Sequence, residues 1–214
     1  MNPADWIVPF VVLIISLTVH EAAHAWVALL GGDRTALRAG QVTLNPLPHI
    51  QREPFGMLVL PLLTLWSTNG NSSFGFAHAP YDPYWAARNP RRAAVMSLAG
   101  PLANVVLAAI AFVVLWYIAR PESGTEAGVR QIATRFLFLN LLLAVFNLVP
   151  LPPLDGAGVV RGLFPATGRF FDAIERIPYS TLVVFVLMSY WLVPLYYPIY
   201  NAVDSLLPHS TRYH

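Results

Sequence analysis

The chain has no cysteine among its 214 residues. Disulfide bonds are therefore excluded, and so is any metal site that uses thiolate ligands. A metal ion bound by this chain would need histidine and carboxylate ligands instead. The six histidines and eleven acidic residues are consequently the candidates for such a site.

Lysine is also absent, so that all 13 basic residues are arginines, and charged residues of either sign make up only 11% of the chain. Soluble domains carry roughly 25%. Hydrophobic residues make up 56% of the sequence, the mean hydropathy is +0.55 and the formal net charge is +2. This composition indicates an integral membrane protein, and the small, scattered positive charge speaks against binding to nucleic acid.

Long apolar segments, by contrast, are plentiful, and a bilayer crossing takes ~20 mostly apolar residues. We expect transmembrane helices at about Trp6–Leu30, Ala93–Ala119, Ile132–Val149 and Tyr179–Tyr197. The residues before Trp6 lack the basic stretch and the cleavage site of a signal peptide, so the first helix is expected to be retained. The predicted fold class is an all-α polytopic membrane protein with about four full crossings.

The first apolar segment contains the pattern H-E-A-A-H at residues 20–24. Two histidines four residues apart lie on one face of a helix, one turn apart. Glu21 follows the first histidine, where it can reach a metal-bound water. H-E-x-x-H is the signature of zinc metalloproteases. Because ionisable groups are costly inside a membrane span, the combination of His20, Glu21 and His24 there indicates a functional metal site.

A catalytic zinc needs three protein ligands and one open position, so a third ligand must come from elsewhere in the chain. Asp155 is the best candidate, because it follows the third long apolar segment and lies between prolines and Gly156, which bend and fix the backbone. Glu21 then remains as the general base that activates the water and later protonates the leaving amine. Taken alone, Asp155 could equally be a helix cap or turn residue.

The apolar segment from Pro54 to Trp66 is short for a crossing and contains an internal proline. We predict a re-entrant or hairpin membrane segment there, because entry and exit on one side bring Asp155 to the Gly31 end of the first helix, near the histidines. The positive-inside rule makes that face cytoplasmic and puts the N-terminus on the outer side. The expected location is the plasma (inner) membrane. The arginines that share this face are Arg34, Arg38, Arg52, Arg88, Arg91, Arg92, Arg161, Arg169 and Arg176.

The remaining segments are predicted mainly as irregular structure. Residues 40–44 alternate like a short strand, and residues 45–50 are typical of a turn. Loops are expected at residues 74–92 and 120–130, and a basic loop is expected between Gly156 and the last apolar segment.

Several polar residues allow more than one interpretation. Asn147 and Asn104 lie in apolar segments, where each could simply hydrogen-bond a neighbouring helix. His49 and His78 lie in expected loops and are interpreted as surface or substrate-groove residues rather than zinc ligands. Two alternatives to a protease are a metal transporter or metal-binding membrane protein, which would not need Glu21, and a pseudoprotease that binds clients without cutting them. The intact Glu21 argues against the pseudoprotease.

Four separated motifs in this chain resemble those of the site-2 protease family of intramembrane zinc metalloproteases. They are HEAAH at residues 20–24, NPLPHI at 45–50 with PFG at 54–56, NPRR at 89–92 with AGPLAN at 99–104, and FNLVPLPPLDG at 146–156. The chain is similar to the compact bacterial and archaeal type, which lacks a PDZ or CBS domain. It departs from the family pattern at Gln51, where an Asp is usual, and at His78, where a Lys is common.

The resemblance implies one Zn²⁺ ion per chain bound by His20, His24 and Asp155, with Glu21 catalytic. It also implies that Asn147 helps to hold the substrate or the oxyanion, and we assign Asn104 to the same group. The expected substrates are transmembrane proteins cut within or near the bilayer in regulated intramembrane proteolysis. We expect a single protease domain over residues 1–214, with its catalytic core at about 6–160 and a C-terminal helix at about 179–197.

Overall fold

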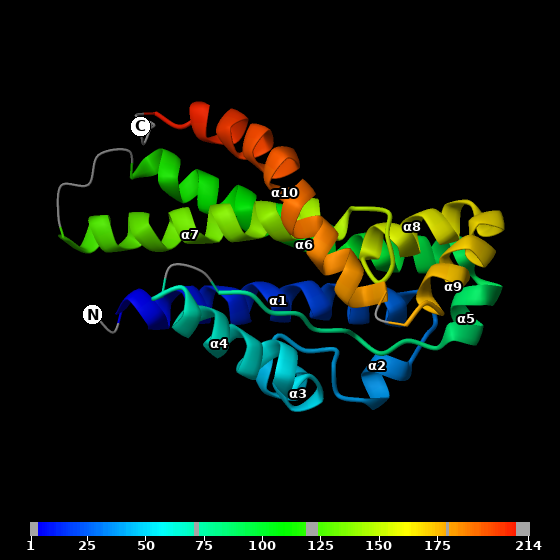
Figure 1. The fold of residues 1–214 in the computed structure, drawn as a ribbon. Helices are drawn as coiled ribbons and strands as arrows, with labels where there is room; N and C mark the ends of the chain where they lie inside the picture. Colours follow the sequence, from blue (N-terminus) through cyan, green and yellow to red (C-terminus); the bar gives the residue numbers. More distant parts are fainter. Residues whose placement is uncertain (1–3, 71–72, 119–123, 179, 209–214) are drawn as a thin grey trace.

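The computed structural model describes residues 4–70, 73–118, 124–178 and 180–208, and every regular element in these ranges is a helix (Figure 1). The all-α fold class is thus confirmed. The elements are α1 (Ala4–Leu30), α2 (Thr35–Arg38), α3 (Pro46–Arg52), the π-helix η1 (Phe55–Val59), α4 (Leu60–Ser67), α5 (Pro83–Arg88), α6 (Pro90–Tyr117), α7 (Gly124–Asn147), α8 (Asp155–Leu163), the 3₁₀ turn η2 (Pro165–Thr167), α9 (Gly168–Glu175) and α10 (Ser180–Ser205).

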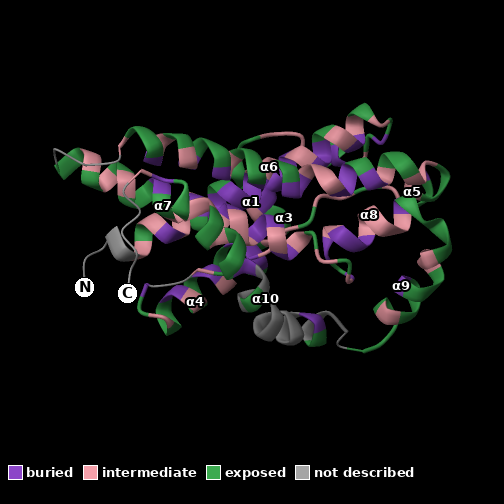
Figure 2. Cartoon of the chain, turned by 90° about the horizontal axis from the view of Figure 1, so that it is seen from above, coloured by how far each residue is buried: buried purple, intermediate pink, exposed green. Residues whose placement is uncertain are grey.

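Three long helices, α1, α6 and α7, pack side by side and form the centre of the molecule (Figures 1 and 2). Each is long and apolar enough to cross a membrane. The outward face of α6 carries Val106, Ile110 and Val113, all more than half exposed, at the spacing of one helix face. Such an apolar outer face fits contact with lipid tails. The last apolar segment forms α10, and its membrane crossing stays a prediction.

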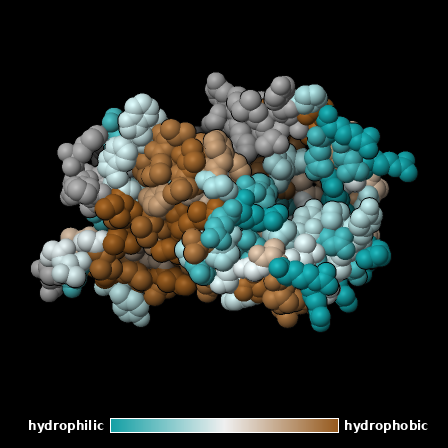
Figure 3. Space-filling model, turned by 90° about the horizontal axis from the view of Figure 1, so that it is seen from below, coloured by the Kyte–Doolittle hydropathy of each residue, from teal (hydrophilic) through white to brown (hydrophobic). Residues whose placement is uncertain are grey.

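On the face seen in Figure 3, hydrophobic side chains gather over the half nearer the N-terminus and hydrophilic ones gather toward the opposite end. The hydrophobic half contains the N-terminal part of α1 together with α4, and the hydrophilic end contains α2, α5 and α9. A polar end beyond an apolar belt is the arrangement expected when the helices project from a bilayer on one side.

The short apolar segment forms η1 and α4, which run from α3 toward the N-terminal end of α1 (Figures 1 and 2). The chain then returns along α1 as an extended segment, residues 73–82, which we call the strap. It passes α3 and reaches α5 at the end of the molecule opposite the N-terminus (Figure 1). The Phe76 N–H donates to the Gly56 carbonyl at 3.1 Å, and a Cβ on Gly56 would collide with that same Phe76. The hairpin therefore closes where a glycine permits it.

Asp33 holds the far end of the strap against the end of α1. Its buried carboxylate accepts hydrogen bonds from the Asp82 N–H at 2.8 Å and from the Thr35 N–H and hydroxyl at 2.8 and 2.6 Å. Burial opposes ionisation, but the hydrogen bonds from Thr35 and Asp82 outweigh it and lower the pKa of Asp33. The strap is thereby tied to the helix that carries the H-E-x-x-H pattern.

The predicted strand at residues 40–44 is wrong, because this stretch bends without pairing to any described residue as a strand would. Side chains, rather than a partner strand, form hydrogen bonds with the backbone here. The Gln41 amide donates to the Pro48 carbonyl at 2.8 Å, and the His49 ring donates to the Thr43 carbonyl at 3.0 Å. The predicted turn at residues 45–50 is also wrong, since α3 starts there. Asn45 caps that helix by accepting from the Leu47 N–H at 3.0 Å.

Other expected loops are partly helical. Residues 124–130 belong to α7, and α5 lies within residues 74–92, capped by Asp82, which accepts from the Tyr84 N–H at 2.8 Å. The expected basic loop contains α8, η2 and α9. Arg161 of α8 pairs there with Asp172 at 3.3 Å and with Glu175 at 3.0 Å. Local caps and the ion pairs of Arg161, rather than apolar periodicity, stabilise these short helices, which explains why periodicity alone did not find them.

Candidate metal centre

Helix α1 brings the two histidines of the H-E-x-x-H pattern together in the interior. The His20 and His24 rings lie 4.6 Å apart, edge to face, and both are buried, as is Glu21 between them. Their Nε2 atoms are 3.0 Å apart. The helix period, which stacks residues i and i+4, is the local cause of this geometry.

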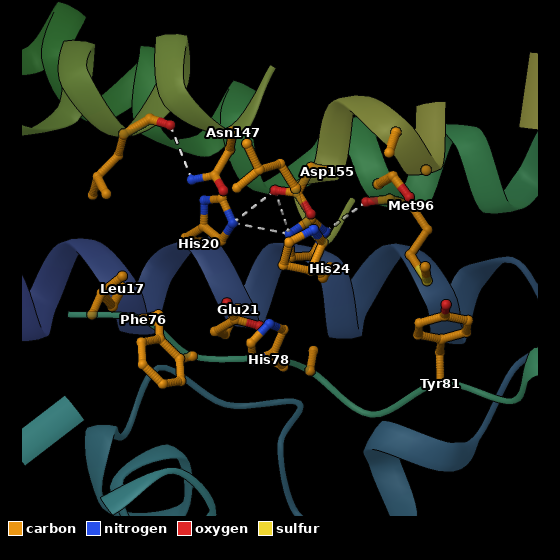
Figure 4. A pocket seen from close by; sticks show the side chains of 18 of the residues that line it. Leu17, His20, Glu21, His24, Phe76, His78, Tyr81, Met96, Asn147 and Asp155 are labelled. Carbon is orange, nitrogen blue, oxygen red and sulfur yellow. Dashed lines mark hydrogen bonds and ion pairs between the residues drawn. The ribbon is translucent and has the colours of Figure 1, made fainter. Parts of the chain in front are cut away.

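Asp155 comes to the same point from the N-terminus of α8 (Figure 4). Its Oδ2 atom lies 3.1 Å from Nε2 of His20 and 3.3 Å from Nε2 of His24. The bent segment before it, residues 148–154, returns the chain from the end of α7 to α1. The structure thus brings together the three side chains that the sequence predicts as metal ligands.

Hydrogen bonds on the far side of each ring decide where the ring protons lie. Nδ1 of His24 is 2.7 Å from the Met96 carbonyl oxygen, which can only accept, so Nδ1 carries the hydrogen. Nδ1 of His20 is 2.6 Å from Oδ1 of Asn104, whose Nδ2 in turn donates to Asn140. With both Nδ1 atoms protonated, each neutral ring presents a bare electron pair at Nε2.

Three electron-pair donors therefore converge on one point with no hydrogen among them. Oδ2 of Asp155 is buried and lacks a hydrogen-bond partner among the described residues, although both Nε2 atoms are close. Such an arrangement repels itself unless a cation occupies the centre. The ligand separations of 3.0–3.3 Å fit a tetrahedral ion, because bonds of ~2.0–2.1 Å place ligands about 3.3 Å apart.

Glu21 is a weaker candidate for the third ligand. A carboxylate oxygen of Glu21 lies within 4.8 Å of ligand atoms of both histidines, so a set of His20, Glu21 and His24 is possible on distance alone. Asp155 approaches both Nε2 atoms more closely, and we prefer it for that reason. Oε2 of Glu21 is buried and has no hydrogen-bond partner among the described residues, which leaves it available to a water molecule.

A cavity of about 400 Å³ opens beside these side chains. The strap lines one wall, and Asn147 and Asp155 line the other (Figure 4). Asn147 donates one N–H to the Leu143 carbonyl at 3.0 Å. His78 also lines the cavity, which agrees with its interpretation as a groove residue. His49 lies within α3, is fully buried and does not line the cavity, so its interpretation as a surface or groove residue is wrong.

Asn104 is not brought to the cavity. It is fully buried behind His20, with Oδ1 accepting from the His20 ring and Nδ2 donating to Asn140 at 2.8 Å. The structure thereby favours the alternative in which this amide bonds to a neighbouring helix. Asn140 continues the chain of hydrogen bonds to the Ser16 hydroxyl at 3.0 Å and to the Phe136 carbonyl at 2.9 Å.

Asn140 and Ser16 were not among the predicted site residues. Both are fully buried polar residues in apolar helices, α7 and α1, and with Asn104 of α6 they join all three long helices behind the metal centre. A polar residue inside an apolar segment was the signal that could have pointed to them. Which helix each one faces depends on the packing, so the sequence alone leaves their partners open.

Gly100 of α6 allows the closest approach to the centre. A Cβ at this position would overlap the Nε2 atoms of both His20 and His24. Only a glycine fits between the α6 backbone and these nitrogens, so the space in front of them is kept open.

Known proteins similar to this chain are metalloproteases, in agreement with the metal centre described above. The model of "Peptidase family M50" matches residues 9–123 and 117–189. The chain belongs to peptidase family M50. An M50 peptidase is a metalloprotease, and thus a hydrolase. Membership of this family, together with the three apolar helices, makes the chain a membrane metalloprotease of the site-2 protease family.

Several known relatives share most of their length with this chain. "Putative zinc metalloprotease YwhC" of Bacillus subtilis is 36% identical over 200 residues, which cover 88% of this chain and 86% of the relative. "Putative zinc metalloprotease Rip2" of Mycolicibacterium smegmatis is 31% identical over 206 residues, which cover 92% and 76%. Their names imply zinc as the metal. No solved structure matches the chain.

Proposed function

We propose that this M50 peptidase is an intramembrane zinc endopeptidase that cuts transmembrane proteins, with one zinc ion per chain. The supporting observation is the convergence of His20, His24 and Asp155, as three bare electron pairs, beside the buried Glu21 in the interior of apolar helices. A two-histidine, one-carboxylate ligand set with an open fourth position is typical of catalytic rather than structural zinc.

Zinc held by these three residues would polarise the scissile carbonyl and make a nucleophile available near neutral pH. Glu21 receives the proton of the attacking water and passes it to the leaving amine. Its position supports this role, because a carboxylate oxygen of Glu21 lies within 4.8 Å of ligand atoms of both histidines and Oε2 is buried without a protein partner among the described residues. Asn147 offers its second N–H to the carbonyl oxygen of the substrate, since its first N–H is bonded to Leu143.

A transmembrane substrate must unwind before it can be cut, because an intact helix hides its carbonyl groups in hydrogen bonds. The strap supplies an extended template along the cavity. Phe76 turns its N–H toward η1, and the His78 carbonyl accepts from Arg52 of α3. Because alternate residues of an extended chain face opposite edges, Ala77 and Ala79 present the other edge, and neither has a backbone partner among the described residues. We assign the substrate strand to this edge.

Replacing Ala77 by proline removes one of these donors, and we expect kcat/KM for a transmembrane substrate to fall by about 2- to 12-fold, the equivalent of about 0.5–1.5 kcal/mol for one hydrogen bond. Leu44→Pro is the control, because Leu44 is exposed and lies in the segment that forms no strand. Equal losses in the two variants, measured as initial cleavage rates, would contradict substrate pairing with the strap.

Replacing Asn104 by alanine frees Nδ1 of His20 and leaves the ring without a fixed orientation. We expect the affinity for zinc to fall by about 10- to 100-fold, as for other residues that support metal-bound histidines. A competition titration with a chromophoric zinc chelator measures this change. Asn201→Ala, an exposed position on α10, is the control and should keep the wild-type affinity. A wild-type affinity in the Asn104 variant would remove its role in orienting His20.

We also propose that the centre faces the cytoplasm from the plasma membrane. The hydrophilic end that carries α2, α5 and α9 contains arginines of the face predicted as cytoplasmic, among them Arg34, Arg88 and Arg169. Asp155 and the histidines lie toward this end of α1, so that fragments released from a transmembrane substrate would leave on the cytoplasmic side. Regulated intramembrane proteolysis is the process that such a release would serve.

The deciding experiment uses the purified full chain in phospholipid vesicles with a labelled single-span substrate. We expect two fragments cut within the span, identified by mass spectrometry, no cleavage after removal of zinc with a chelator, and recovery on addition of zinc. Zinc uptake into the vesicles without cleavage would support a transporter. Substrate binding without cleavage by the zinc-loaded protein would support a pseudoprotease, and either result would overturn the proposal.

A further inference from the structure

A second cavity, of about 250 Å³, lies where α1, α7 and α10 meet. Pro9 and Val12 of α1 line it, and they precede His20 by 8–11 residues, about 12–16 Å along the helix axis. It is therefore separate from the metal centre and close to the N-terminal end of α1. Ser73, at the start of the strap, completes its wall.

Arg135 of α7 contributes the charge in this cavity. The side chain is half-buried and makes no hydrogen bond or ion pair with any residue in the described part of the chain. Arg130, five residues earlier, differs because it donates to the Ile118 carbonyl at 2.9 Å. An unpaired guanidinium within an apolar helix costs free energy, and an anionic ligand would offset that cost.

Ser73 provides a second, independent indication of a ligand. Its Oγ atom is buried and has no hydrogen-bond partner among the described residues, and the side chain lines the same cavity as Arg135. The hydroxyl of Thr134 donates to the Arg130 carbonyl, so its oxygen also remains able to accept. The cavity thus presents unused hydrogen-bond donors from Arg135 and Ser73, which fit a ligand with several acceptor oxygens.

The rest of the wall is apolar. Val12, Phe138 and Leu142 face the same space, so a ligand that fills it needs a hydrocarbon part as well as an anionic one. The position along the helices agrees, because Pro9 is one turn from Trp6, and Arg135 is one turn inside the apolar segment that starts at Ile132. At this depth a long arginine side chain reaches the level of the lipid head groups.

We propose that this cavity is a binding site for one phospholipid molecule. The phosphodiester accepts hydrogen bonds from the Arg135 guanidinium and the Ser73 hydroxyl, and an acyl chain lies against Val12, Phe138 and Leu142. Inorganic phosphate shares the anionic chemistry but leaves the apolar wall uncovered. A lipid is therefore favoured over the free ion, and a phosphodiester head group over an uncharged one.

The site has a structural consequence for α10. This helix is attached to α7 through the Tyr196 hydroxyl, which donates to the Phe138 carbonyl at 3.2 Å, and through ring contacts of Phe138 with Tyr196 and Tyr200. Tyr200 and Phe138 both line the cavity. A lipid bound there would bridge α1, α7 and α10 beside these contacts and strengthen the attachment of α10.

The test is a titration of the delipidated full chain, followed by native mass spectrometry. The probes are phosphatidylglycerol, diacylglycerol with the same acyl chains, and inorganic phosphate. We expect one phosphatidylglycerol per wild-type chain, bound at least tenfold more tightly than either other probe. Arg135→Gln should weaken phosphatidylglycerol binding by at least tenfold. Arg176→Gln removes the same charge at an exposed position on the other end and should bind as the wild type does.

Two further variants keep the test informative if Arg135→Gln does not fold. Arg135→Lys retains the charge and should retain most of the binding, whereas Ser73→Ala should weaken it several-fold without changing the charge. The proposal is overturned if Arg135→Gln or Ser73→Ala binds phosphatidylglycerol as the wild type does. It is equally overturned if diacylglycerol or inorganic phosphate binds as tightly as the phospholipid.

Discussion

Replacement of Glu21 by glutamine is expected to lower the rate of peptide cleavage by about 10²- to 10⁴-fold, the contribution of a positioned general base. Glutamine has nearly the same shape but cannot accept the proton of the attacking water. Zinc should remain bound, because the ligand separations that fit the ion are those among His20, His24 and Asp155. The experiment measures single-turnover cleavage of a transmembrane substrate and the zinc content of the same sample.

The matched control for this variant is Glu53→Gln, which makes the same chemical change outside the cavity and should cut at the wild-type rate. Loss of zinc from the Glu21 variant would make Glu21 a ligand in place of Asp155. Normal cleavage with zinc bound would refute the general-base mechanism. An inactive variant that retains zinc can also trap substrates, which gives a route to their identification.

Replacement of Gly100 by alanine is expected to remove zinc from the protein. The added Cβ would overlap Nε2 of His20 and of His24, the two atoms that present their electron pairs to the ion. Moving α6 away is resisted by the hydrogen bonds of Asn104 and Met96 to the same rings, since both residues belong to α6. We expect the zinc affinity to fall by at least the 10- to 100-fold seen when support of a metal ligand is lost.

Gly128→Ala is the control for this change, because Gly128 lies on α7 and a Cβ there meets no atom within 4 Å. In a helix that substitution should be neutral or stabilising by roughly 0.5–1 kcal/mol. Elemental analysis after dialysis gives the zinc content, and circular dichroism shows whether the helices persist. Full zinc occupancy in a folded Gly100→Ala protein would mean that the ion does not lie in front of these two nitrogens.

The fold class and most residues of the candidate site could be predicted from the sequence. Helices and bilayer crossings depend on apolar runs and on local periodicity, and the three long helices were predicted within a few residues at most ends. His20 and His24 needed only the helix period. Asp155 needed one further inference, that the short apolar segment lets the chain return to the Gly31 end.

Predictions failed where distant residues decide the local structure. Residues 40–44 alternate in hydrophobicity as a strand does, but no partner strand lies beside them, and side-chain hydrogen bonds from Gln41 and His49 hold the segment bent. The strap has no such alternation and is nevertheless extended, because η1 and Asp33 hold it at its two ends. A strand or strap depends on what it lies against, which a local pattern does not contain.

By itself, then, the sequence determined that this is an all-α membrane protein with an H-E-x-x-H pair in its first long helix, because both properties follow from short-range periodicity and hydrophobicity. Only the tertiary structure decided that Asn104 lies behind His20 instead of at the substrate, that Asn140 and Ser16 support it, and that Gly100 faces the two Nε2 atoms. The physical reason is that the face of each helix that meets another is set by packing among α1, α6 and α7, and hydrogen bonds between residues 84 and 124 positions apart exist only after that packing has formed.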